Sequence, residues 1–238
     1  MLGSARGRGK PPAARPAWRP RSTRPYLPST VRGQWFFLYL ILDVFSRKIV
    51  GHNVQEADAA EHAAHLVKRT ALAEGIALNE HRLVLHGDNG STLKATTVLA
   101  MLHWLGIDPS YSRPRVSNDN AHAESVFKTA KYRPEFPAEG FDSVETARAW
   151  SAAFVHWYND EHRHSGIGYV TPAQRHSGED VEILEARQAL YESKRAERPE
   201  RWSGSTRDWS RTNLVTLNPE REGLCHAANE AADMRQTG

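Results

Sequence analysis

The chain has 238 residues, of which 39% are hydrophobic and 25% charged, a composition that allows one good-sized core with appendages. Its longest apolar run, Trp35 to Leu42, has the length of a strand and excludes a membrane span. No apolar stretch follows the basic start Met1 to Lys10, which excludes a secretory signal, and the single cysteine, Cys225, excludes an internal disulfide and fits a reducing cytoplasm.

The net charge of +3 is unevenly distributed along the chain. Residues 1–42 contain eight Arg or Lys residues and no acidic residue, so residues 43–238 carry a net charge of −5. Residues 1–25 consist mostly of Gly, Ala, Arg and Pro, which bury too little surface to offset the entropy of ordering. We therefore expect a disordered basic segment at 1–25. A role of this segment in holding phosphate is the alternative.

Ordered structure is expected from about Gln34. The aromatic and aliphatic run Trp35 to Leu42 predicts a central strand, and Lys48 to Val54 predicts the returning strand of an antiparallel hairpin. Asp58 is placed to cap a helix that runs to about Glu74. The pattern then predicts a strand at 82–86, a helix at 92–105 ended by Gly106, a strand at 109–112 and, after a polar loop at 113–120, the helix that carries Glu124.

The rest of the chain is predicted to be helical and then irregular. Pro134 and Pro137 break the helix of Glu124, and Asp142 or Ser143 caps a long helix with an apolar face. Pro172 opens a short helix. The remaining boundaries are a core at 26–178, a helical and irregular extension at 179–220 and a loose tail at 221–238. This order of elements is typical of an α/β protein with a mixed sheet.

Two acidic residues stand at the ends of predicted elements. Asp88 follows an apolar strand, Glu124 lies near the start of a helix, and 35 residues separate them. An Asp after a buried strand and a Glu on a later helix can share Mg²⁺ or Mn²⁺, and Mg²⁺ keeps water and substrate phosphate as its other ligands. The pattern therefore indicates a metal site that acts on phosphate.

Asp88, the 35-residue gap and Glu124 resemble the second and third acids of DDE transposases and retroviral-type integrases. Four motif words, in order, resemble the OrfB-type transposase of the IS-three family of insertion sequences: 86–91 (HGDNGS), 112–120 (SRPRVSNDN), 157–159 (WYN) and 162–166 (HRHSG). The resemblance covers about residues 26–220. It implies an RNase H-like core with a mixed five-stranded sheet flanked by helices. It also implies Mg²⁺ or Mn²⁺ as cofactor, the DNA of element ends and targets as partner, a homo-oligomer when active, and a nucleoid-associated location in the bacterial cytoplasm.

The first acid of the family is where this sequence departs from the pattern. In the family that Asp opens a short motif whose last three residues match Tyr26, Leu27 and Pro28. In this sequence Thr23 stands at the position of the Asp. A hydroxyl cannot replace a carboxylate that bridges two ions, and Pro25 removes a backbone donor from the strand. We therefore expect a degraded first strand and an inactive, N-terminally truncated transposase, with out-of-frame or artificial sequence at 1–25.

Asp43 is a doubtful substitute for the missing acid. It is the only Asp before Asp58, but it ends the second strand, where the family carries an additional Asp. We expect it to cap the turn into Phe45 and Ser46 instead.

Several residues near the acids are candidates for contact with DNA. Lys128 and Lys131 fall four and seven positions after Glu124, on one helix face, where lysines of integrases meet viral DNA ends. The alternative is an ion pair between Glu124 and Lys128. Four residues of the loop at 113–120 are further candidates for DNA contact: Arg113, Arg115, Asn118 and Asn120. The alternative role of the two arginines is loop solubility, and that of the two asparagines is turn formation.

The twelve histidines show no zinc spacing. His162 and His164 are two positions apart, hence on different faces of any helix, and their likeness to the C-terminal motif of the family suggests packing or DNA contact. His86 either tunes the site or is a buried strand-end residue. The leading function is a DDE recombinase domain that cuts and joins DNA. A non-catalytic DNA-binding or dimerising remnant is the second, and a glycosidase with two carboxylates, disfavoured by the nearby cations, is the third.

Overall fold

The computed structural model describes residues 26–76, 83–88, 90–113, 121–212 and 215. The predictions of disorder at 1–25 and of a loose tail at 221–238 lie outside these residues. The same holds for five residues of the argument above: Thr23, Pro25, Arg115, Asn118 and Asn120. Among the described helices, none is both long and apolar enough to cross a membrane.

A three-stranded antiparallel sheet forms the centre of the structure. Its strands are β1 (Tyr26–Pro28), β2 (Trp35–Leu42) and β3 (Ile49–Gln55), in the order β1-β2-β3. Phe37 of β2 pairs with Gln55 of β3, and the register shifts between Ile41 and Leu42. The predicted hairpin and a first strand before Trp35 are thus confirmed, and that first strand is only three residues long.

The second sheet contains two parallel strands, β4 (Val84–Gly87) and β5 (Asp108–Tyr111). The prediction of one mixed five-stranded sheet is therefore wrong for the described residues, in which hydrogen bonds define sheets of three and two strands. β1 pairs with β2 over all three of its residues, and among the described strands none bridges β1 to β4.

Helices α1 (Ala60–Ala73) and α2 (Thr96–Leu105) connect the two sheets through side chains. Val67 and Val98 lie in a buried cluster that also contacts Ile41 of β2 and Leu85 of β4. Asp58 does not cap α1; the N-cap is Ala59. The carboxylate instead accepts hydrogen bonds from the hydroxyls of Tyr39 (2.8 Å) and Thr92 (3.2 Å). The helix predicted at 92–105 is divided into a 3₁₀ turn, η2 (Thr92–Lys94), and α2, with Gly106 ending α2 in the left-handed conformation as expected.

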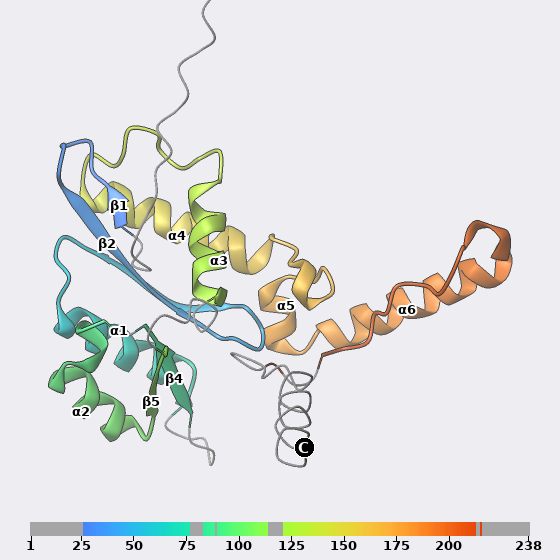
Figure 1. Ribbon diagram of the computed structural model, residues 1–238, viewed down its shortest axis with the longest axis horizontal. Helices are drawn as coiled ribbons and strands as arrows, with labels where there is room; N and C mark the ends of the chain where they lie inside the picture. The colour runs from blue at the N-terminus through green and yellow to red at the C-terminus, as the bar shows by residue number, and fades with distance from the viewer. Residues whose placement is uncertain (1–25, 77–82, 89, 114–120, 213–214, 216–238) are drawn as a thin grey trace, which may run out of the picture.

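Helices α3 (Ala121–Lys131) and α4 (Val144–Asp160) cover the opposite face of the three-stranded sheet, as Figure 1 shows. Ser143 caps α4: its Oγ accepts the N–H of Thr146 at 3.2 Å, and Oγ1 of Thr146 accepts the N–H of Ser143. Of the two predicted caps, Asp142 and Ser143, the second is therefore confirmed. The apolar face of α4 packs on the sheet through Phe154 and Tyr158, which are both almost fully buried.

The C-terminal part forms an arm that projects from the core (Figure 1). After a 3₁₀ turn, η4 (Ser165–Ile167), come α5 (Pro172–Ser177), α6 (Asp180–Glu197) and η5 (Pro199–Arg201). Pro172 stands at the start of α5 as predicted, with Thr171 as cap. The returning chain packs Trp209 against Leu184 of α6 and Ile167, so the base of the arm has its own small core.

Candidate active site

Asp88 is the first residue after β4, where the parallel pair of strands ends. Its Oδ1 accepts the N–H of Gly90 at 3.0 Å, which fixes a tight turn directly after the strand. A Cβ atom at Gly87 would come 2.2 Å from Cδ1 of Leu93, so a larger residue there would push on the neighbouring 3₁₀ turn. The carboxylate of Asp88 is thus presented at a strand end, as the sequence predicts.

His86 ties this strand end to β5. Its Nδ1 lies 3.0 Å from Oγ of Ser110 and its Nε2 lies 3.3 Å from Oγ of Ser112. The Ser112 hydroxyl donates its one proton to the carbonyl of Gly87 at 3.2 Å, so its oxygen accepts the Nε2–H of His86. In this tautomer Nδ1 of His86 carries no proton and accepts the hydroxyl of Ser110. His86 is half-buried, and it links Gly87, the residue before Asp88, to the end of β5, from which Arg113 follows.

Glu124 lies in the first turn of α3 on its exposed side. Val126 and Ala130 are buried against Tyr158 and its neighbours, which leaves Glu124 and Lys128 in solvent. No ion pair joins these two side chains in the part of the chain that the structure describes, so the alternative of a Glu124–Lys128 pair gains no support. Lys131 is half-buried, and burial lowers its pKa.

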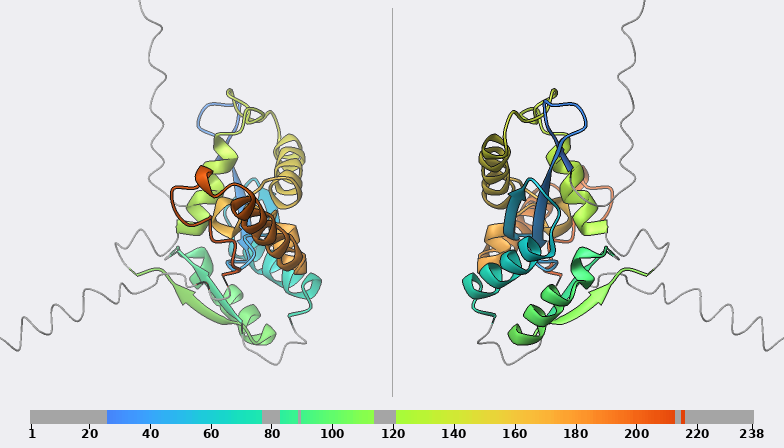
Figure 2. Two further views of the ribbon diagram at one scale, coloured as in Figure 1. Left: turned by 90° about the vertical axis from the view of Figure 1, so that its right-hand side faces the viewer. Right: turned by 90° about the vertical axis from the view of Figure 1, so that its left-hand side faces the viewer.

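The first turn of α3 is the end of that helix nearer to the layer of β4 and β5 in Figures 1 and 2. That Asp88 and Glu124 share an ion remains a prediction. Their carboxylates are the hard oxygen donors that Mg²⁺ prefers, and two of them suit an ion that keeps water and phosphate as further ligands. Within the described residues, no group of three or more His, Cys, Asp or Glu side chains has the arrangement of a metal site.

Asp43 has a structural role in the turn between β2 and β3. Its Oδ1 accepts the N–H of Phe45 at 3.1 Å, and its Oδ2 accepts the N–H and the hydroxyl of Ser46 and lies 3.3 Å from Nδ1 of His176. Burial raises the pKa of Asp43, but the bonds from Ser46, Phe45 and His176 outweigh burial and hold it below 3.8. The other ring nitrogen of His176 contacts Glu74 at 3.0 Å. These contacts confirm the interpretation of Asp43 as the cap of the turn.

A group of basic side chains near the start of α3 was missed in the sequence. Arg47, in the β2–β3 turn, is hydrogen-bonded to His122 of α3. His162 and His164 would lie on different faces of any helix, but they follow the end of α4 at Asp160 and are not part of a helix. Their ring centroids are 5.7 Å apart. No local pattern could reveal this group, because its members come from three separate segments.

Two family models, both described as integrase core domain, match residues 23–117 and residues 105–172. The matches meet between β5 and the start of α3, so together they span both candidate acids, Asp88 and Glu124. Residues 23–172 are therefore similar to integrase core domains, and the helices and strands described above confirm the predicted α/β class.

Transposases of insertion sequences are similar to this part of the chain. The transposase of IS904 from Lactococcus lactis subsp. lactis is 31% identical over 147 residues, which are 57% of this chain and 53% of that protein. A putative transposase of IS986/IS6110 from Mycobacterium tuberculosis is 28% identical over 144 residues, 58% of this chain and 50% of that protein. The chain thus spans about half the length of these relatives. Among solved structures, the catalytic core domain of BIV integrase superposes with a TM-score of 0.45 and 18% identity, covering 66% of this chain and 90% of that one.

Proposed function

We propose that the chain is the catalytic-core part of an insertion-sequence transposase of the OrfB type, a domain that acts on DNA strands with Mg²⁺ or Mn²⁺. The observation that carries the proposal is the pair of acids within the integrase core domain: Asp88 at a strand end and Glu124 on the exposed face of α3. The similarity to insertion-sequence transposases supports DNA as the substrate.

Each part of the site has a role in this proposal. Asp88 and Glu124 hold the metal, which when bound activates the attacking oxygen and stabilises the leaving oxygen. Lys128 is exposed four positions after Glu124 and Lys131 lies one turn further, so both can contact DNA phosphates beside the metal. His86 holds the end of β4 against β5 and so keeps Asp88 and Arg113 at a fixed separation.

The proposal includes the loss of strand joining in the chain as it stands, because Thr23 occupies the position of the first acid. Asp43 cannot take over that duty without giving up its bonds to Phe45, Ser46 and His176. Loss of one bridging carboxylate is expected to lower the rate by several powers of ten, each worth about 1.4 kcal/mol of the activation barrier.

The test is a strand-transfer assay on the terminal-repeat DNA of the parent element, in Mg²⁺ and in Mn²⁺. It compares this chain, its Asp88→Asn variant and a version with Asp-Ile-Thr rebuilt at 23–25. We expect joining by the rebuilt version alone. If this chain joins ends and Asp88→Asn does not, Thr23 is not the defect and Asp43 becomes the candidate for the first acid.

The second candidate function is a DNA-binding or dimerising remnant without catalysis, which Thr23 favours. It predicts that the rebuilt version also fails to join ends, although the chain binds DNA. Binding is expected to be weak and to fall steeply with salt, since it relies on phosphate contacts of exposed side chains such as Lys128. Filter binding between 50 and 200 mM salt measures this.

A further inference from the structure

The side chains of Arg47, His122, His162 and His164 form a histidine–arginine cluster. Arg47 bonds His122, and the rings of His162 and His164 lie 5.7 Å apart, with the ring of Tyr158 at 5.5 and 6.4 Å from them. His162 and His164 are half-buried, so the cluster is partly open to solvent. Three segments contribute to it: the β2–β3 turn, the first turn of α3 and the chain after α4.

Within the residues that the structure describes, no salt bridge joins a side chain of the cluster to a carboxylate. The charge of Asp43 attracts Arg47, but the Asp43 carboxylate is also hydrogen-bonded to its own turn. Arg47 also has φ +67°, a left-handed conformation that costs a non-glycine residue roughly 1–2 kcal/mol. Nε of Arg47 is also buried without a hydrogen-bond partner among the described residues, which leaves a donor of the cluster available to an anion.

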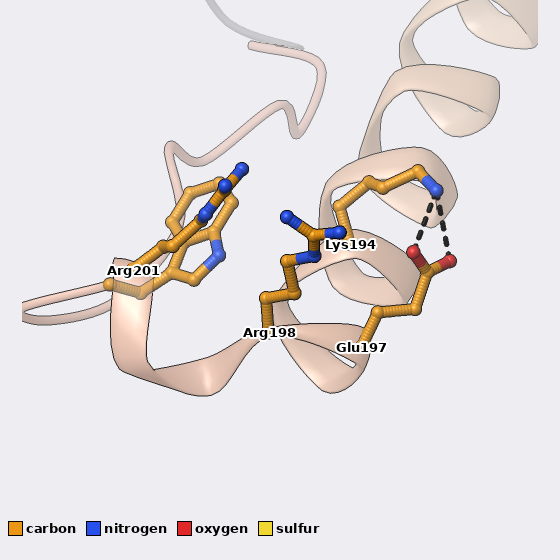
Figure 3. A pocket seen from close by; sticks show the side chains of 5 residues that line it. Lys194, Glu197, Arg198 and Arg201 are labelled. Carbon is orange, nitrogen blue, oxygen red and sulfur yellow. Dashed lines mark hydrogen bonds and ion pairs between the residues drawn. The ribbon is translucent and has the colours of Figure 1, made fainter.

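A second basic surface, at the tip of the arm, contains its own carboxylate partner. A hollow of about 430 Å³ is lined there by Lys194, Glu197, Arg198, Arg201 and Trp202 (Figure 3). The ammonium of Lys194 is bound to both oxygens of Glu197 at 2.9 and 2.8 Å, so part of its charge is already neutralised. The histidine–arginine cluster is therefore the stronger candidate for an anion site.

We propose that the histidine–arginine cluster binds a phosphodiester group of DNA and takes up protons as it does so. The proposal rests on the proposed function and adds to it a phosphate subsite on the inner side of α3. His122 and Glu124 share the first turn of this helix. A phosphate at the cluster therefore lies in the same helical turn as the candidate metal ligand but on the opposite side of the helix, where it would hold a part of the DNA away from the reacting strand.

Proton uptake follows from the charges that face the two half-buried rings. Burial lowers the pKa of His164 to about 4, with further contributions from His162, Arg47 and His122. Burial and Arg133 lower the pKa of His162. Both rings are thus largely neutral at pH 7, and a bound phosphate opposes these effects and raises both pKa values. Tyr158, whose pKa is raised to about 12, stays neutral throughout.

The two histidines differ in how readily they take up a proton. Nδ1 of His164 accepts the N–H of Gly166 at 3.3 Å, so protonation at that nitrogen has to break this bond. The ring nitrogens of His162 form no hydrogen bond within the described part of the chain. His162, which stacks on Trp157 at 4.8 Å, is therefore expected to titrate first.

The experiment measures binding of a fluorescently labelled random-sequence DNA duplex by anisotropy at pH 7.5 and 5.5, at one salt concentration. The variant His162→Gln/His164→Asn removes both titrating rings, and the Asn oxygen can replace Nδ1 as acceptor for Gly166. The matched control is His65→Gln/His103→Gln, because both of these histidines are exposed and lie on α1 and α2. Circular dichroism at both pH values checks that all three proteins are folded.

We expect the unmodified chain and the control to bind DNA up to about ten-fold more tightly at pH 5.5 than at pH 7.5 if binding raises the pKa of one histidine by about one unit, and the cluster variant to lose this gain. Calorimetry at pH 6 in two buffers of different ionisation enthalpy should then give up to about half a proton taken up per binding event for the chain and none for the cluster variant. Equal pH dependence in all three proteins would overturn the proposal.

A different outcome would separate this proposal from the proposed function. If the chain binds DNA at neither pH, the proposed function fails, and the cluster is then tested with pyrophosphate. NMR titration of the imidazole signals should show a pKa of His162 that rises by about one unit when pyrophosphate is present. An unchanged pKa would refute the phosphate site itself.

Discussion

Asp180 at the start of α6 holds together a buried ion network that fastens the arm to the core. Its carboxylate is fully buried and accepts two N–H groups of Arg211, at 2.8 and 2.9 Å, while Nη1 of Arg175 lies 3.6 Å away. Arg175, only 2% exposed, also donates to the carbonyls of Phe45 and Thr212, at 2.8 and 2.6 Å. The network thus joins the β2–β3 turn, the base of α6 and the returning chain.

The substitution Asp180→Asn keeps the size of the side chain but removes its charge and one acceptor. Arg175 and Arg211 then face each other without a counter-charge, and breaking a buried ion pair in this way costs about 3–5 kcal/mol. Because typical domains are stable by only about 5–15 kcal/mol, this is a large fraction of the total. At about 2–4 °C per kcal/mol, a loss of 3 kcal/mol corresponds to a decrease in Tm of about 6–12 °C.

Urea unfolding followed by tryptophan fluorescence and by far-UV circular dichroism measures this effect, since Trp209 is buried at the base of the arm. The matched control is Asp208→Asn, because the carboxylate of Asp208 is exposed and is held by the nearby Ser210, whose N–H it accepts at 2.8 Å. We expect the control to unfold at nearly the urea concentration of the unmodified chain. If Asp180→Asn unfolds together with the control, the network does not stabilise the arm as we argue.

Two further predictions concern the edge of the sheet and the β2–β3 turn. Gly140→Ala should lower Tm strongly, because Gly140 has φ +99° and a Cβ there would come 2.7 Å from the carbonyl oxygen of Pro28. The control is Gly33→Ala, since Gly33 has φ +87° but open space around it. In a thermal melt, the control should lower Tm by less. Asp43→Asn should lower Tm at pH 7. Since the folded pKa of Asp43 is held below its unfolded value of 3.8, the stability it contributes is present above that pH and is lost as the pH falls through the folded pKa. The difference in Tm between the two proteins should therefore shrink below about pH 3.8, and a difference that stays constant down to pH 2.5 would contradict this reasoning.

Elements with strong local signals were predicted correctly from the sequence. The hairpin of β2 and β3 follows from two apolar runs separated by a short turn, and Ser143 was recognised as one of two possible caps of α4. Gly106 ends α2 in the left-handed conformation that favours glycine. In each case the residues that decide the structure are neighbours in the chain.

Predictions that depended on distant residues were less successful. Asp58 was assigned to cap α1 by its position, but the hydroxyls of Tyr39 and Thr92 hold its carboxylate elsewhere. On a helix His162 and His164 would lie on different faces, but the chain leaves the helix before them. Arg47 was not singled out at all, because its partner His122 lies 75 residues away in sequence. Tertiary contacts of this kind override local propensity and leave no periodic pattern.

The two sheets give a physical argument for the proposal that strand joining depends on the segment around Thr23. Parallel sheets are normally covered on both faces, yet Val84 of β4 is 60% exposed and Leu83 just before it 39% exposed. Among the described residues, β4 is held beside the three-stranded sheet by the side chains of α1 and α2 rather than by backbone hydrogen bonds. Asp88 continues from this weakly held strand, whereas Glu124 sits on a helix packed firmly against the other layer. Under the proposed function, a longer first strand with an Asp at the position of Thr23 would supply the third carboxylate. It would also fix the layer of Asp88 relative to that of Glu124.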